Sequence, residues 1–238
     1  MRYVGICLCF VMAGVYAPSS FSEDDLWFSE IALGAVATSG NTEERNIKVR
    51  LDSTRDNSLT RYKQKFHLNV LNNNKDEEVT AQKFYGAYEL AYKLDGNDSI
   101  FGRVSYEDDR FNGFDYQADV TVGYNREMMS NESQVLNLNA GIGARFSEFE
   151  LGGKEEELIV RLGGDFTWKV SANAVFMQSV SAEIGSDSTI SRSETALSSD
   201  IVGNLAMKLA LNIKHQSEVP FGNDKTDTET SMTVVYKF

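Results

Sequence analysis

Charged side chains recur at every second position in several segments of this chain. These regularly spaced charges are the residues most suited to form a functional site. Side chains two residues apart point to the same face of a β-strand. If that face lines an enclosed space, a basic wall opposite an acidic wall orders water and ions, as in a narrow pore. The basic residues expected to face such a lumen are Lys48, Arg50, Arg61, Lys63 and Lys65, and the acidic ones are Glu107, Asp109 and Asp119, with Glu183, Glu194 and Glu229 further along.

Two interpretations of this charged face stay open. In the first, the lumen conducts small solutes weakly, with a cation preference that follows its acidic surplus. In the second, the charged residues pair with one another and fill the lumen. The predicted role is accordingly either structural or that of a narrow channel for small solutes and ions.

The sequence contains few residues that could support catalysis. The histidines are His67 and His215, and both cysteines, Cys7 and Cys9, lie in a segment that we expect to be removed. A serine hydrolase needs a serine and an orienting partner within hydrogen-bond reach of a histidine. Ser217, two residues from His215, is the nearest candidate, but serines are common here. We therefore predict that the protein is not an enzyme, with a lipid-modifying enzyme as the alternative.

Metal and cofactor sites are not predicted either. Glu155-Glu156-Glu157 and Asp224 could bind divalent cations between lipopolysaccharide phosphates. Their spacing, however, lacks the regular ligand pattern of a calcium loop, and a charge run of this kind is usually a solvated loop. We predict no catalytic, cofactor-binding or metal-binding residue.

The overall composition excludes two classes of protein. Among 238 residues, 35 are acidic and 23 are basic, which gives a net charge of −12, and 11% are aromatic. A disordered chain would be poorer in aromatic residues. An acidic chain repels phosphate, so a nucleic-acid partner is not expected.

The alternating charges require β-strands to position them, and the dominant period from residue 27 to 238 is two. The pattern predicts an all-β protein, a closed antiparallel up-and-down transmembrane β-barrel of about twelve strands, within a range of about ten to fourteen. With both termini at one end, the odd-numbered connections should be the longer ones. The clearest strands are Ile47–Ser53, Thr60–Val70, Tyr116–Asn125, Leu136–Phe146, Leu158–Lys169 and Leu205–Lys214, and the weaker ones are 28–38, 79–94, 99–110, 174–185, 192–202 and 227–238.

The N-terminus has the layout of a cleaved signal peptide. A basic start, Met1-Arg2-Tyr3, precedes an apolar run from Val4 to Ala17 and the small-x-small triplet Ser20-Phe21-Ser22. The apolar run is too short to span a membrane comfortably. We expect residues 1–22 to be removed, which leaves residues 23–238 as one outer-membrane barrel domain.

The last strand favours a membrane barrel over a soluble periplasmic ligand-binding barrel. Thr230, Met232 and Val234 alternate with polar residues and lead to Tyr236 and Phe238. This ending resembles the signal by which outer-membrane proteins are recognised for assembly, so Tyr236 and Phe238 are the expected assembly signal. The predicted location is the outer membrane of a Gram-negative bacterium. The predicted partners are outer-membrane lipid and lipopolysaccharide, the outer-membrane assembly machinery, and small ions or solutes.

Three motifs together resemble a known family. They are Ser39-Gly40-Asn41-Thr42, Tyr106-Glu107-Asp108-Asp109-Arg110-Phe111 and the terminal Val234-Val235-Tyr236-Lys237-Phe238. Their order and positions are similar to those of the salt-induced outer membrane proteins, a domain of unknown function. The resemblance covers essentially the whole mature chain. It implies an outer-membrane barrel linked to salt or envelope stress, and it supplies no catalytic residues.

Overall fold

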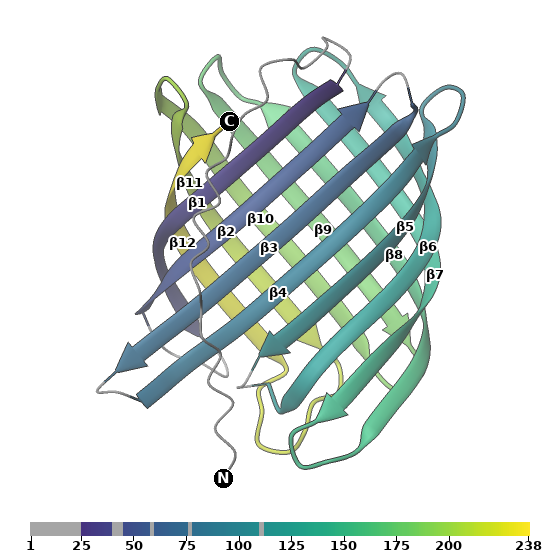
Figure 1. Ribbon diagram of the computed structural model, residues 1–238, viewed down its shortest axis with the longest axis vertical. Coiled ribbons are helices and arrows are strands. Elements are labelled where there is room, and N and C mark those ends of the chain that lie inside the picture. The colour runs from purple at the N-terminus through teal and green to yellow at the C-terminus, as the bar shows by residue number, and fades with distance from the viewer. Residues whose placement is uncertain (1–24, 40–44, 58–59, 76–77, 110–111) are drawn as a thin grey trace.

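A computed structural model describes residues 25–39, 45–57, 60–75, 78–109 and 112–238. The predicted signal peptide, residues 1–22, lies outside the described residues. Within the described residues the chain forms one closed antiparallel barrel (Figure 1), which confirms the predicted fold and strand number. Its twelve strands are β1 (Asp25–Ser39), β2 (Arg45–Asn57), β3 (Tyr62–Lys75), β4 (Glu78–Lys93), β5 (Asp98–Asp109), β6 (Phe114–Ser130), β7 (Gln134–Phe149), β8 (Lys154–Lys169), β9 (Ala174–Gly185), β10 (Thr189–Val202), β11 (Leu205–Gln216) and β12 (Thr226–Lys237).

Each strand pairs with its neighbours in the sequence, and the ring closes between β1 and β12. Leu33 lies opposite Val234 in this closing pair. Beyond the last strand, the amide N–H of Phe238 donates to the carbonyl of Ser29 at 2.9 Å, and the reverse bond is 3.0 Å. Closure therefore leaves none of the twelve described strands at an open edge of the sheet.

None of the described residues form a helix long and apolar enough to cross a membrane.

The two faces of each strand differ in the way that the alternating sequence predicts. On β5, Arg103 and Glu107 are buried inside the ring, whereas Ile100 and Val104 are about half exposed on the outside. The outward face elsewhere is also apolar, with 67% exposure at Ile142. A soluble barrel places its apolar residues inside and its charges outside, so this distribution is the inverse.

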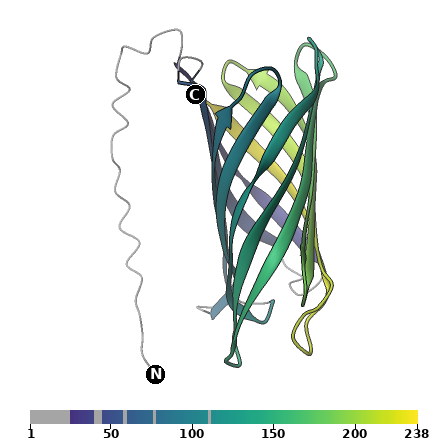
Figure 2. The same ribbon diagram turned by 90° about the vertical axis from the view of Figure 1, so that its right-hand side faces the viewer.

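The two ends of the barrel differ in their connections (Figures 1 and 2). The C-terminus lies at one end, here called the terminal end, and the long connection between β11 and β12, residues 217–225, lies at the opposite loop end. We expected the odd-numbered connections to be longer than the even-numbered ones. Among the connections that the structure describes completely, only the β11–β12 connection is clearly longer. The reason is that the strands continue into the predicted loops: Glu148 pairs with Lys154, and Arg145 pairs with Glu157.

The connection between β11 and β12 reaches across to the opposite wall. Gly113, in the connection between β5 and β6, has φ of +79°. A Cβ atom at this glycine would lie 2.8 Å from Cγ of Pro220 and 2.5 Å from Nδ2 of Asn223. Glycine is therefore required here both by its backbone conformation and by the close approach of the opposite loop.

Outward aromatic pairs lie toward both ends of the wall. Tyr62 and Tyr92 have ring centroids 5.3 Å apart, and both adjoin connections at the terminal end. Tyr106 stacks on Tyr116 with centroids 5.8 Å apart, toward the loop end. Tyrosine suits the boundary between an apolar layer and water, because its ring is apolar and its hydroxyl needs a polar neighbour.

Candidate functional site

The inward faces of the strands enclose a cavity of about 500 Å³. Acidic and basic side chains contribute equally to its lining, so the wall carries little net charge. The basic residues are Arg50, Lys83, Arg161, Arg192, Lys208 and Lys214, and the acidic residues are Glu107, Asp109, Asp165, Glu194, Asp227 and Glu229.

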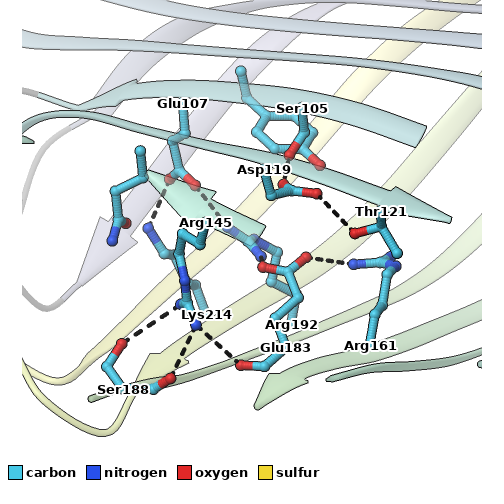
Figure 3. Close-up of polar contacts among 12 residues, drawn as sticks. Ser105, Glu107, Asp119, Thr121, Arg145, Arg161, Glu183, Ser188, Arg192 and Lys214 are labelled. Atoms are coloured by element: carbon cyan, nitrogen blue, oxygen red, sulfur yellow. Dashed lines mark hydrogen bonds and ion pairs between the residues drawn. The ribbon is translucent and has the colours of Figure 1, made fainter. Parts of the chain in front are cut away.

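Glu107 is the centre of a contact that crosses the lumen. Its Oε1 lies 2.8 Å from Nζ of Lys214 on β11 and 3.3 Å from Nζ of Lys83 on β4. Its Oε2 accepts a hydrogen bond of 2.9 Å from Nη2 of Arg192 on β10. Because β5 and β11 lie six strands apart in a ring of twelve, the Glu107–Lys214 contact joins opposite walls. We call Lys83, Glu107, Arg192 and Lys214 the Glu107 cluster. Figure 3 shows Glu107, Arg192 and Lys214 of this cluster.

Arg192 also makes a second contact across the lumen. The guanidinium carbon of Arg192 lies 5.9 Å from the ring centroid of Tyr85 on β4, again six strands away. A guanidinium at this distance from an aromatic ring is attracted by the ring quadrupole. Two independent contacts therefore join the same pair of walls.

Glu183 on β9 gathers guanidinium groups beside the Glu107 cluster (Figure 3). Its Oε2 lies 3.0 Å from Nη1 of Arg192, and its Oε1 pairs with Arg161. Arg103 lies 4.0 Å from the same carboxylate and donates a 2.8 Å hydrogen bond to Asp119. The planar fork of arginine suits such shared carboxylates. We call Arg103, Asp119, Arg161, Glu183 and Arg192 the Glu183 cluster.

The Glu107 cluster lies toward the loop end. Glu107 is two residues from the end of β5, and Lys214 is two residues from the end of β11. Arg192 is three residues after the start of β10, which follows a connection at the loop end. The lumen is therefore bridged close to the end that carries the long connection.

The basic residues predicted on β2 and β3 are also paired. Lys48, which is 2% exposed, pairs with Glu229. Arg50 lies 2.7 Å from Glu194 and 2.5 Å from Asp52.

On β3, the pairs are looser. Lys63 lies 3.7 Å from Asp56, and Lys65 lies 3.0 Å from Glu89. These side chains are more exposed than Lys48, so the lumen is more open toward the terminal end.

The acidic residues predicted on β5 and β6 meet basic partners that the sequence analysis did not single out. Asp109 lies 3.0 Å from Lys83, and Asp119 accepts from Arg103 and from the hydroxyl of Ser105. The basic and acidic walls therefore do not confront one another as free surfaces. These charges are neutralised by ion pairs, some between neighbouring strands and some across the lumen, and the cavity lining carries equal numbers of acidic and basic residues.

Arg61 differs from the expectation that it faces the lumen. It precedes β3, adopts φ of 60°, and its side chain is about half exposed at the terminal end. Its guanidinium lies 3.0 Å from Asp95 in the connection between β4 and β5. The strand alternation does not extend to Arg61 because the left-handed backbone conformation breaks it.

Neither histidine is joined to a serine in a hydrogen bond found within the described chain. Nδ1 of His67 lies 2.5 Å from Oδ1 of Asp52 in the lumen. Nδ1 of His215 lies 2.8 Å from the Thr226 hydroxyl on the outward face. The Ser217 hydroxyl instead accepts from the amide N–H of Thr189 at 2.9 Å. The arrangement that a serine hydrolase would need is not assembled at His215 and Ser217.

Several basic residues of the lumen, most of them in the two clusters, were missed as site residues by sequence reasoning. A usable signal was present, because each lies on the polar face of an alternating strand. What the sequence did not contain was the pairing across the lumen, which depends on the tilt and closure of the ring. The missed residues are Lys83, Arg103, Arg145, Arg161, Arg192, Lys208 and Lys214.

The fold and the charged interior define a closed antiparallel barrel of the kind found in porins. The NanC porin structure has the same fold, with a TM-score of 0.59 and 11% sequence identity over 87% of this chain and 100% of that chain. The KdgM porin aligns with a TM-score of 0.49 and 12% identity over 88% and 99% of the two chains.

The family follows from the sequence match. Residues 31–238 match the family described as "Protein of unknown function, DUF481", and the chain belongs to this family. A similar protein is the "Uncharacterized protein YdiY" of Escherichia coli (strain K12). It is 27% identical over 208 residues, which cover 85% of this chain and 80% of that protein.

Proposed function

We propose that this protein is an outer-membrane barrel of a Gram-negative bacterium whose lumen passes small ions and solutes only weakly. The membrane part of the proposal is supported by the apolar outward face, on which Val122, Ile142 and Leu162 are exposed. Lipid requires every backbone polar group to be paired inside the protein, and a closed barrel meets that requirement. Outer-membrane lipid and lipopolysaccharide would surround this face.

The narrow passage is supported by one observation above all, the Glu107 cluster. Its carboxylate binds cations from β4, β10 and β11, so it crosses the lumen near the loop end. A solute must pass beside these ion pairs or displace them. This limits the passage to ions and small polar solutes.

Assembly and export are part of the same proposal. Tyr236 is half exposed on the outward face, and its ring stacks on Phe238 with centroids 6.1 Å apart. Both are therefore accessible to an assembly machinery at the terminal end, which would face the periplasm. Residues 1–22 would direct export and then be removed.

A role under salt or envelope stress is a separate part of the proposal. It rests on the resemblance of three sequence motifs to the salt-induced outer membrane proteins. Growth of a deletion strain at raised salt concentration, compared with the complemented strain, tests this part separately.

Planar-bilayer recording of the purified wild-type protein tests conduction. We expect small, discrete conductance steps in KCl, and no steps from protein that has been boiled before addition. Absence of steps from protein with heat-modifiable gel mobility, which reports a folded barrel, would contradict the proposed passage and leave a structural role.

A further inference from the structure

A second cavity lies at the loop end, outside the two charged clusters. Its volume is about 400 Å³, and it shares no lining residue with the lumen cavity. It is built from the connections that follow β5, β7, β9 and β11, because Gly113, Leu151, Asp187 and Pro220 all line it. We call it the mouth pocket.

One side of the mouth pocket is apolar. Phe114 and Phe149 have ring centroids 4.9 Å apart, and Phe114 is 3% exposed. Leu151, at the tip of the hairpin between β7 and β8, is fully exposed. Val219 and Pro220 contribute from the opposite loop. The apolar part of a ligand could pack against these side chains and so be removed from water.

The other side of the mouth pocket is acidic. Glu155, Asp187 and Glu218 line it, and within the described residues no lysine or arginine does. The carboxylates of Glu155 and Asp187 are close enough to act on one another. Lys225 reaches Glu218 at 3.5 Å, but both of these side chains are more than half exposed. Two neighbouring carboxylates favour a positive charge placed between them.

Asp187 is held at the rim by a network beneath it. Oε2 of Glu157 accepts a 3.0 Å hydrogen bond from the amide N–H of Asp187. Glu157 itself lies 3.1 Å from Arg145, which donates to the carbonyl of Ser188 at 2.9 Å. The turn between β9 and β10 is thus fixed with the Asp187 carboxylate at the pocket, where its Oδ2 accepts a hydrogen bond of 3.1 Å from the Ser186 hydroxyl.

Gln117 supplies an independent sign of a ligand. It lines the mouth pocket and is 5% exposed. Its Nε2 donates to Ser147 at 3.4 Å, but its Oε1 has no hydrogen-bond partner among the residues that the structure describes. Ser147 pairs in register with both Gln117 and Glu155, so all three lie in one row across β6, β7 and β8. A buried acceptor without a partner is unfavourable, and a ligand N–H group would satisfy it.

We propose that the mouth pocket binds an amphiphilic organic cation, a protonated primary amine attached to an apolar body. The ammonium group lies between Glu155 and Asp187 and donates to Oε1 of Gln117. The apolar body packs on Phe114 and Phe149. The ligand enters from the loop end, which faces the external medium in the proposed orientation. This binding does not depend on conduction through the lumen.

Isothermal titration calorimetry on the folded, detergent-solubilised protein tests this site. The probe is 2-phenylethylammonium chloride, and the neutral comparison is 2-phenylethanol, with empty micelles as the blank for partition into detergent. We expect saturable binding of the amine and none of the alcohol.

Variants separate the mouth pocket from general surface charge. The double variant Glu155→Gln/Asp187→Asn should weaken binding of the amine about tenfold, because it removes two partly exposed partners of the ammonium group. Gln117→Leu should also weaken it. Glu150→Gln, which removes an exposed charge on the same hairpin outside the pocket, should leave it unchanged, and gel mobility before and after boiling shows that each variant is folded. Equal binding of amine and alcohol, no saturable binding, or equal affinity in the double variant and wild type would overturn the proposal.

Discussion

Glu107 on β5 and Lys214 on β11 meet at 2.8 Å, although their strands lie on opposite sides of the twelve-strand ring. The walls of the barrel are therefore joined by an ion pair as well as by the backbone ladder. Lys83 and Arg192 share the same carboxylate, which is 4% exposed. A buried carboxylate with three cationic partners stays charged, and it holds these long side chains in the centre of the lumen.

Ion selectivity should be weak in the wild-type protein, because six basic and six acidic residues line the lumen cavity. In a tenfold KCl gradient, an ideally selective pore gives a reversal potential of about 59 mV. We expect a value that is a small fraction of this in either direction. A reversal potential near the ideal cation value would show that the acidic surplus of the whole chain controls permeation instead.

Loss of the Glu183 charge should destabilise the barrel. Glu183→Gln leaves Arg161, Arg192 and Arg103 around a neutral group, and breaking a buried ion pair in this way costs about 3–5 kcal/mol. Urea unfolding in lipid vesicles, followed by tryptophan fluorescence, measures the change. Glu150→Gln, an exposed position in the connection between β7 and β8, is the matched control and should change the free energy of unfolding little. Similar unfolding midpoints for the two variants would contradict the expected contribution of the Glu183 cluster to the stability of the barrel.

A charge on the outward face should prevent stable insertion. Ile142 on β7 is 67% exposed on this face, and Ile142→Lys should cost about 2–4 kcal/mol in a bilayer. Asn137→Lys, on the inward face of the same strand opposite Asp165, is the matched control and should be tolerated. The folded fraction after mixing with vesicles is read from gel mobility before and after boiling. If both variants fold equally well, the outward face does not meet lipid.

The C-terminal aromatic residues should matter for assembly more than for the folded barrel. Phe238→Ala removes half of the outward Tyr236–Phe238 pair and should lower the amount of barrel in the outer membrane several-fold. Phe221→Ala, at the fully exposed tip of the connection between β11 and β12, should not. Immunoblots of outer-membrane fractions compare the two. Equal amounts would remove Phe238 from the assembly signal.

The strands and their faces could be predicted because alternation is a local property of the sequence. Val120 and Val122 point outward while Asp119 and Thr121 are buried inside, as their spacing indicates. The alternation of polar and apolar residues is weakest on β10, where the polar residues Ser193 and Thr195 lie on the outward face. Both hydroxyls form hydrogen bonds with the side chain of Gln178 on β9, at 3.0 Å for Ser193 and 2.6 Å for Thr195. These bonds satisfy the two polar groups, which the pattern alone would place inside the barrel.

The partners of the lumen charges could not be predicted, because pairing across a ring depends on geometry that no local pattern contains. Lys214 is separated from Glu107 by 107 positions in the chain, and only closure at β1 and β12 brings them together. The ends of the strands also differ from those that the sequence predicts. Glu148 and Glu157 resemble loop residues in composition, yet both pair in the β7–β8 hairpin. Glu157 is buried there because it forms an ion pair with Arg145, which the local sequence does not reveal.

Single-channel recording of Glu107→Ala beside wild type tests whether the ion pairs at Glu107 restrict the lumen. The variant leaves Lys83, Arg192 and Lys214 without their shared carboxylate. We expect a larger unitary conductance and a reversal potential shifted toward anion selectivity, whereas Asp165→Ala, elsewhere in the same cavity, should not increase conductance in this way. Unchanged conductance and selectivity in a folded Glu107→Ala barrel would contradict this restriction.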